Sequence, residues 1–194
     1  IRPALHSGGK FANNVDQVSG GLHGVGLSVV NALAALLELE IKRDGQVWFQ
    51  TYRRGKPDGV IQAIGKSKKT GTKIRFVPDE EIFTSTEFSY DVLAQRLREQ
   101  AFLNRGIKVF LADERADKKV EFEYAGGIAS FVEHLNRNKN PLHPKPIFFD
   151  DAAEREGSEE RCEVALQWND SYGEQLFTFT NTINNRDGGT HLEG

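Results

Sequence analysis

At residues 19–26 the chain reads Ser19-Gly20-Gly21-Leu22-His23-Gly24-Val25-Gly26. Glycines that lead straight into a helix leave backbone N–H groups free to approach an anion, and the N-terminus of the helix adds a partial positive charge. The stretch therefore has the architecture of a phosphate-binding loop. Glycines alone do not decide the matter, because they also serve a tight turn into a helix that binds nothing.

The spacing of the glycines excludes two common nucleotide-binding loops. A dinucleotide-binding turn has the pattern G-x-G-x-x-G after a strand, but Val29 stands where the third glycine belongs and a loop precedes the motif. A P-loop has four residues between its first glycine and its glycine-lysine pair, whereas five residues separate Gly59 from Gly65, and no helix is expected at 68–71. The phosphate-binding stretch must belong to another fold.

The segments on either side of this stretch differ in character. Residues 7–21 are rich in glycine and asparagine and predict a long loop, of the kind that carries function. From Val25 onward apolar residues recur at helical spacing, which predicts a helix with one face on a sheet. The apolar positions are Val25, Val29, Val30, Leu33, Leu36 and Leu37.

Strand patterns dominate the rest of the first block. Asp44-Gly45 is a dipeptide favoured in two-residue hairpins, because both positions tolerate positive φ, and it joins strands predicted at 38–43 and 46–52. Further expected elements are strands at 60–64 and 72–77, a helix at 90–102 and a hairpin of 107–111 with 120–124. Many strands without alternating βαβ units predict an α+β fold, in which a mixed or antiparallel sheet is layered with helices.

A second block begins near Gly126-Gly127, which sets expected domain bounds of 1–125 and 126–194. A short helix is predicted from the apolar residues Ile128, Phe131, Val132 and Leu135. The remaining expectations are an acidic surface loop at 150–161, strands at 163–168 and 175–181, and a glycine-rich loop at 186–191.

Composition restricts the class of protein. A chain of 194 residues with 38% hydrophobic and 27% charged residues can bury one good core or two modest ones. No apolar run approaches the roughly 20 residues that span a bilayer, and residues 1–6 lack the apolar stretch of a secretory signal, so a cytoplasmic protein without a membrane partner is expected. The net charge of -3 supplies no global basic field for DNA. The single cysteine, Cys162, is expected to be a small core residue.

Two stretches carry a resemblance to a known family. They are Leu5-His6-Ser7-Gly8-Gly9-Lys10-Phe11 and the run 18–33. They resemble the ATP lid and the third nucleotide motif of the ATPase subunits of type II DNA topoisomerases, gyrase B and its topoisomerase IV counterpart. The resemblance continues over nearly the whole chain, through residues 69–72, 102–104, 138–144, 165–170 and 186–192.

The resemblance implies a fold and an order of domains. The family belongs to the GHKL ATPase superfamily, shared with chaperones, MutL and histidine kinases, whose fold is a mixed sheet layered with helices. Residues 1–125 would form the C-terminal part of the ATPase domain, with the ATP lid, and residues 126–194 would begin an α/β transducer domain. The later stretches resemble gyrase more closely than topoisomerase IV.

The resemblance also implies roles for single residues. Lys10 corresponds to a lysine that reaches the nucleotide phosphates from the lid, although alone it would be a solvated charge. Thr72 corresponds to a threonine at the adenine-side wall, and Arg43 and Thr72 correspond to contacts of aminocoumarin inhibitors. Without the resemblance, Thr72 would be a strand former, Arg43 an exposed charge and His23 a packing residue. The residues implied to wrap the phosphates are Gly20, Gly21, Leu22, His23, Gly24, Val25 and Gly26.

The chain departs from the family at Asp16, where the lid usually carries a tyrosine. An acid beside phosphates is unfavourable unless it points away or a cation intervenes. The family's catalytic glutamate, its magnesium-binding asparagine and its adenine-binding aspartate correspond to positions before Ile1, and a later lysine loop to positions after Gly194. No catalytic residue or metal ligand is therefore assigned within 1–194, and this segment alone is expected not to hydrolyse ATP.

For the parent protein the resemblance implies an enzyme, an ATP-hydrolysing type II topoisomerase that uses ATP and Mg²⁺. ATP binding would close a homodimer of ATPase domains around DNA, and hydrolysis would reset it, coupled to strand passage and negative supercoiling. Implied partners are DNA and the gyrase A protein, in a heterotetramer of two A and two B chains (A2B2). The alternatives are the topoisomerase IV counterpart, another GHKL ATPase, or a segment that acts only as a nucleotide-binding module.

Overall fold

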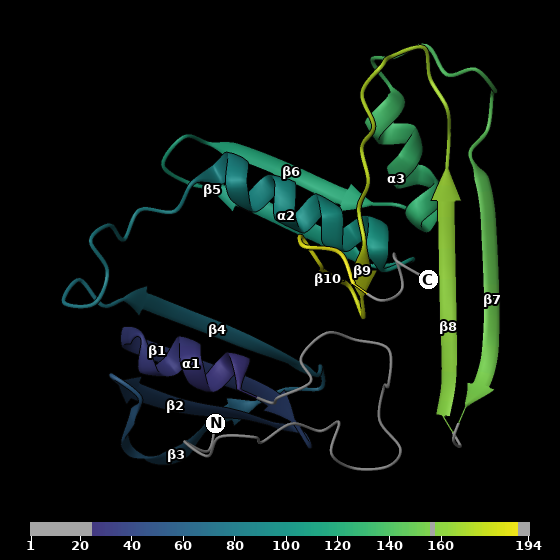
Figure 1. The fold of residues 1–194 in the computed structure, drawn as a ribbon. Helices are drawn as coiled ribbons and strands as arrows, with labels where there is room; N and C mark the ends of the chain where they lie inside the picture. Colours follow the sequence, from purple (N-terminus) through teal and green to yellow (C-terminus); the bar gives the residue numbers. More distant parts are fainter. Residues whose placement is uncertain (1–24, 156–157, 190–194) are drawn as a thin grey trace. The chain divides into compact units, whose positions relative to one another are not determined.

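The computed structural model describes residues 25–155 and 158–189 (Figure 1). The chain divides into two compact units, the first ending at Glu87 and the second beginning at Phe88. Each unit is described by itself below. The predicted domain boundary at residues 125 and 126 stays a prediction.

The first unit is one short helix on a four-stranded antiparallel sheet. Its elements are α1 (Gly26–Ala32), β1 (Ala34–Arg43), β2 (Gln46–Arg53), β3 (Lys56–Lys66) and β4 (Gly71–Pro78). The strands lie in the order β3-β2-β1-β4, so β1 pairs with both β2 and β4. All of these pairings are antiparallel.

Two tight turns link the first three strands. Asp44 and Gly45 have φ angles of 54° and 78°, as a type I′ hairpin requires, and this predicted turn is confirmed. Arg54 and Gly55 form a second turn of the same kind, with φ angles of 48° and 80°.

The core of the first unit lies on one face of this sheet. Alternate residues of β1 point to this face, and the buried members Leu37 and Leu39 pack with Ala34 and Tyr52. Val30 of α1 packs against the same cluster, so α1 covers this face.

The predicted helical stripe from Val25 to Leu37 is wrong in its second half. The helix ends at Ala32, and Leu36 and Leu37 belong to β1, where they pair with Val77 and Phe76. A short continuous apolar run has no period of its own, so it cannot be assigned to helix or strand from spacing alone. Leu36 and Leu37 are in a strand because they pair with β4, which is distant in sequence.

The second unit carries two longer helices and three antiparallel strand pairs among its described residues. Its elements are α2 (Tyr90–Leu103), β5 (Lys108–Asp113), β6 (Lys118–Glu123), α3 (Gly127–Asn136), β7 (Ile147–Arg155), β8 (Ser158–Leu166), β9 (Phe179–Thr180) and β10 (Ile183–Asn184). The predicted helix at 90–102, the hairpin that follows it and the helix after Gly126 are confirmed. Paired antiparallel strands with helices packed on them confirm the α+β class.

Aromatic rings join α2 and α3. Phe102 of α2 is fully buried, its ring centroid lies 3.6 Å from that of Tyr124, and the two rings stack. The Phe102 ring also contacts the rings of Phe131 and His134 of α3, at centroid distances of 5.2 and 5.4 Å. These rings pack α2 against α3.

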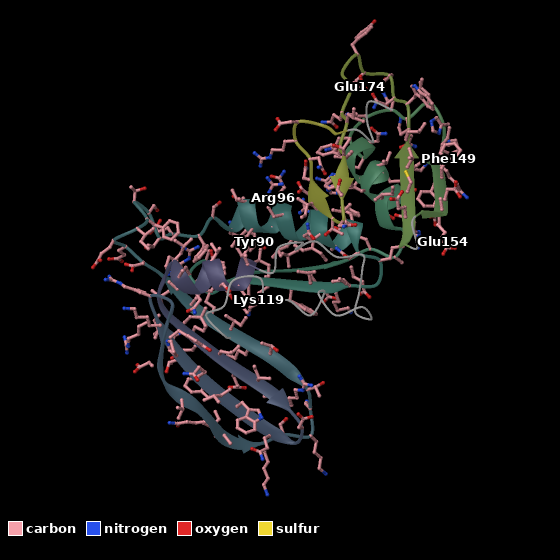
Figure 2. All side chains as sticks on the ribbon, turned by 60° about the horizontal axis from the view of Figure 1, so that its bottom comes forward. Tyr90, Arg96, Lys119, Phe149, Glu154 and Glu174 are labelled. Atoms are coloured by element: carbon pink, nitrogen blue, oxygen red, sulfur yellow. The ribbon has the colours of Figure 1, made fainter. Side chains whose placement is uncertain are left out.

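Three predictions for the second unit are wrong. Residues 150–155 and 158–161 are not a loop, because they belong to β7 and β8, which pair with each other and bring Arg161 to Asp150. The faces of this two-stranded ribbon are largely exposed, and even Phe149 on β7 has 58% of its surface exposed (Figure 2). Acidic side chains are therefore tolerated on both strands of the ribbon. Cys162 is exposed on the same ribbon and is not a core residue. Of the strand predicted at 175–181, only Phe179–Thr180 forms a ladder.

Candidate functional site

The predicted site residues divide into those that the structure describes and those that it does not. Val25, Gly26, Arg43 and Thr72 are described. Lys10, Gly20, Gly21, Leu22, His23, Gly24 and the unusual Asp16 lie outside the described residues.

Val25 and Gly26 lie at the start of α1. Val25 is the N-cap residue, and its carbonyl accepts from the N–H of Val29 at 2.9 Å. Its side chain makes no capping hydrogen bond, and the first turn of α1 holds no acidic residue. A side chain that began at Gly26 would meet no heavy atom of the described residues within 4 Å. Within residues 25–155 and 158–189, therefore, no N-cap side chain accepts from the backbone donors in the first turn of α1.

Arg43 and Thr72 are brought together by the pairing of β1 with β4. Thr72 lies directly opposite Ile41, and Arg43 is two residues further along β1, on the same face. Diagonal neighbours of this kind are roughly 7–8 Å apart. Both side chains are exposed, and the Arg43 guanidinium lies 3.4 Å from the neighbouring carboxylate of Asp44.

The same face offers apolar residues that sequence reasoning did not assign to the site. Trp48 lies opposite Ile41 on β2, and Ile74 follows Thr72 at the next position of β4 on this face, with 40% of its surface exposed. Ile74 could have been found from the sequence, because alternate residues of a strand point to the same face and Ile74 is two residues after Thr72. An apolar strip with a hydroxyl and a guanidinium at its end can hold a planar heterocycle, because the strip covers a ring face while the polar groups meet its edge.

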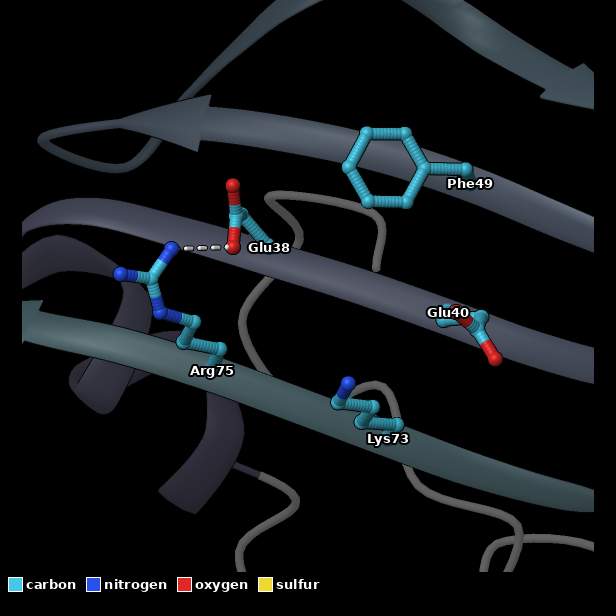
Figure 3. Close-up of a pocket in the computed structure, with 5 residues that line it drawn as sticks. All are labelled: Glu38, Glu40, Phe49, Lys73 and Arg75. Atoms are coloured by element: carbon cyan, nitrogen blue, oxygen red, sulfur yellow. Dashed lines mark hydrogen bonds and ion pairs between the residues drawn. The ribbon is translucent and has the colours of Figure 1, made fainter. Parts of the chain in front are cut away.

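The opposite face of the sheet is unsuited to a nucleotide. It carries a depression lined by Glu38, Glu40, Phe49, Lys73 and Arg75 (Figure 3). Arg75 is held by Glu38 at 2.8 Å, and Lys42 lies 3.4 Å from Glu40. The cavity volume of about 60 Å³ is small beside the roughly 300–1,000 Å³ of ligand pockets. Both glutamates that line this depression are therefore already engaged by basic side chains of the same face.

No group of three or more His, Cys, Asp or Glu side chains is arranged to hold a metal ion among residues 25–155 and 158–189. In the same residues no helix is long and apolar enough to cross a bilayer.

In the second unit, two of the stretches that resemble the topoisomerase family meet. Leu142 donates its N–H to Trp168 O at 2.9 Å, and His143 Nε2 lies 3.2 Å from Trp168 N. Side-chain amides continue the contact, because Asn136 Nδ2 donates to Gln167 Oε1 at 2.9 Å and Gln167 Nε2 donates to His143 O at 2.9 Å. The chain of amides fastens the loop after α3 to the end of β8.

Along its full length the chain aligns with the DNA gyrase B protein of Clostridium acetobutylicum, at 53% identity over 194 residues. The chain belongs to the DNA gyrase B family. It is also 50% identical to the gyrase B protein of Halalkalibacterium halodurans over 196 aligned residues. A family model described as DNA gyrase B matches residues 127–194.

A solved structure supports the same fold for this chain. The 43K ATPase domain of Thermus thermophilus gyrase B, solved in complex with an aminocoumarin, is 35% identical and superposes with a TM-score of 0.76. The match covers 88% of this chain and 46% of that one. The alignments with the Clostridium and Halalkalibacterium relatives span all of this chain and 30% of each relative. The resemblance to gyrase B is confirmed, and topoisomerase IV is not favoured.

Proposed function

We propose that this chain is the ATP-binding portion of a gyrase B protein, an ATP-hydrolysing type II topoisomerase. The protein would couple ATP binding and hydrolysis to DNA strand passage and negative supercoiling. The observation that carries the proposal is the 53% identity to a DNA gyrase B protein along the entire chain.

The nucleotide would meet the first unit at two places. Lys10 and the backbone donors of residues 20–26 bind the phosphates, where the uncapped first turn of α1 adds donors of its own. The adenine lies at the end of the sheet marked by Thr72, with one ring face on the apolar side chains of Ile41 and Ile74. A ring placed there leaves Arg43 free at the rim to contact an aminocoumarin.

The cofactor is ATP with Mg²⁺, which neutralises charge on the phosphates during transfer. The metal ligand and the general base are expected outside residues 1–194. Within the chain, the groups assigned to binding hold the nucleotide and orient it. A glycine-rich lid suits such a role, because it can change conformation at little cost.

The partners follow from the same assignment. ATP binding would close a homodimer of ATPase domains around a DNA segment, and the protein would work with the gyrase A protein in a heterotetramer of two A and two B chains. Residues 126–194 would begin the transducer domain that relays the nucleotide state. The protein would act in the cytoplasm.

The proposal is tested on the full-length protein reconstituted with the gyrase A protein. Relaxed plasmid should become negatively supercoiled when ATP is present and remain relaxed without it. Lys10→Ala should raise the KM for ATP about tenfold or more, the effect of losing a hydrogen bond to a charged group. Lys56→Ala, at an exposed position of β3, is the matched control and should leave the KM unchanged. ATP-dependent relaxation without supercoiling would instead assign the chain to a topoisomerase IV.

The inhibitor contacts are tested by aminocoumarin binding to the same protein. Arg43→Ala should weaken binding about tenfold, and Arg53→Ala should not, although Arg53 is also exposed at a strand end. Arg53 lies at the opposite end of the sheet, because β2 runs antiparallel to β1. Equal binding to the two variants would remove Arg43 from the site.

A further inference from the structure

The loop between β3 and β4 crosses one end of the sheet in the first unit. β3 and β4 are the two edge strands, so the loop has to pass the ends of β2 and β1. Neighbouring strands lie about 4.8 Å apart, so the distance from one edge strand to the other is about 14 Å. The N–H of Ser67 donates to Gly45 O, in the turn between β1 and β2, at 3.0 Å, and the N–H of Lys69 donates to Ser67 Oγ at 3.1 Å. The loop is therefore held across the end of the sheet.

Four exposed lysines gather at this end of the sheet. Lys66 is the last residue of β3, Lys68 and Lys69 lie in the loop, and Lys73, labelled in Figure 3, lies near the start of β4. Among residues 25–155 and 158–189, no carboxylate forms an ion pair with any of the four. Within that part of the chain, their ammonium groups are therefore available to an anion from outside.

The carboxylates at the same end of the sheet already have basic partners. Glu40 lies 3.4 Å from Lys42, and Asp44 lies 3.4 Å from Arg43. Together with the four lysines, these side chains give the end of the sheet a charge of +4, whereas the chain as a whole carries -3. Clustered charges of one sign attract ligands of the opposite sign even where the overall charge does not.

We propose that Lys66, Lys68, Lys69 and Lys73 form a docking surface for the phosphate backbone of duplex DNA. Lysine binds phosphate as a point charge, and contacts to phosphates carry no sequence information, so this surface would hold DNA without selecting its sequence. Each strand of a duplex carries one charge per roughly 3.4 Å of helix axis. A row of lysines about 14 Å long therefore spans about four phosphates of one strand.

The composition of the loop favours a duplex over other anionic partners. Residues 66–70 read Lys-Ser-Lys-Lys-Thr, without an aromatic or a large apolar side chain. Single-stranded nucleic acid is usually held by aromatic rings on which its bases stack, and a protein partner is usually held by buried aromatic or arginine anchors. The loop offers charge alone, which suits a backbone of phosphates. The inference rests on the proposed function for its partner, DNA, and adds the surface that would meet it.

The test is the salt dependence of DNA binding by the full-length protein. Binding of a fluorescein-labelled duplex of random sequence is followed by anisotropy, without nucleotide, between about 50 and about 200 mM KCl. Each phosphate contact contributes about 0.9 to the slope of log K against log salt, so Lys68→Gln with Lys69→Gln should reduce this slope by about 2. Over this range of salt the wild type should then lose about twelvefold more affinity than the variant.

Two matched variants make the result specific. Arg53→Gln with Lys56→Gln removes the same charge from the opposite end of the same sheet, where these two exposed residues pair across β2 and β3, and it should keep the wild-type slope. Lys68→Arg with Lys69→Arg keeps both charges and should also keep the slope, because the contact needs charge and not a particular geometry. All variants should unfold at the urea midpoint of the wild type, since the changed side chains are exposed.

A wild-type slope in Lys68→Gln with Lys69→Gln would overturn the inference. An equal loss of slope in Arg53→Gln with Lys56→Gln would also overturn it, because the net charge of the protein, and not a surface at one end of the sheet, would then set the affinity. Failure of the proposed function looks different, since the wild type reconstituted with the gyrase A protein would then not supercoil DNA in the presence of ATP.

Discussion

Gly55→Ala should destabilise the first unit more than a glycine substitution at the other hairpin turn does. Gly55 has a φ of 80°, and an alanine there would place its Cβ 3.3 Å from Ala32 Cα. An L-residue in the left-handed region costs about 1–2 kcal/mol, and forcing a backbone apart adds about 1–2 kcal/mol more. Gly45→Ala is the matched control, because Gly45 has a φ of 78° and no heavy atom of the described residues within 4 Å of an added Cβ.

The assay is urea unfolding of the full-length protein followed by tryptophan fluorescence. These 194 residues hold two tryptophans, so a background in which Trp168 and any tryptophan outside residues 1–194 are replaced by phenylalanine leaves Trp48 on β2 as the reporter of the first unit. Gly55→Ala should lower the free energy of unfolding by about 2–4 kcal/mol and Gly45→Ala by about 1–2 kcal/mol. Equal losses would refute the close approach of turn and helix.

Three further predictions concern the second unit. Burial against Phe102 lowers the pKa of His134 below its usual 6.5, so the folded state binds fewer protons than the unfolded state. The neutral His134 therefore stabilises the fold above pH 6.5, and this stabilisation is lost as the pH falls below 6.5. In His134→Phe the urea midpoint of unfolding should depend less on pH across this range. The Arg115 guanidinium lowers the pKa of Asp113 from 3.8 to about 2. The ionised Asp113 therefore stabilises the fold above pH 3.8, and this stabilisation is lost as the pH falls through about 2. In Asp113→Asn, acid unfolding should depend less steeply on pH in this range. Exposed Cys162 should react with a thiol reagent in the native protein as fast as in urea, and protection in the native state would contradict its placement.

The sequence predicted correctly those elements whose conformation depends only on neighbouring residues. The hairpin at Asp44-Gly45 could be predicted from the dipeptide itself, because both residues accept positive φ. The turn at Arg54-Gly55 was missed, because arginine is not a usual residue at φ 48°, and Asp79, whose carboxylate pairs with Arg54 at 2.7 Å, comes from another segment. Leu37 was assigned to a helix because the strand that pairs with it, β4, lies far along the chain.

The candidate site was predictable only in part for the same reason. Arg43 and Thr72 could be singled out by resemblance, but nothing in their local sequence indicates that β1 and β4 are neighbours. Ile41 became visible as a lining residue only once the register placed it opposite Thr72, and Trp48 only once the register placed it opposite Ile41 on the other side of β1. The roles of Lys10 and His23 stay predictions, because these residues lie outside the described part of the chain.

The strand order β3-β2-β1-β4 has a consequence for how the sheet folds. The first three strands close their ladders through two-residue turns, over short stretches of chain. β4 can join β1 only after the chain has passed through β2 and β3, when Ala34 comes to face Pro78. Long-range closure costs more entropy than a hairpin and is slower. This topology predicts that the strand that carries Thr72 docks last, so the wall proposed for the adenine would be the final part of this sheet to form on the folding pathway.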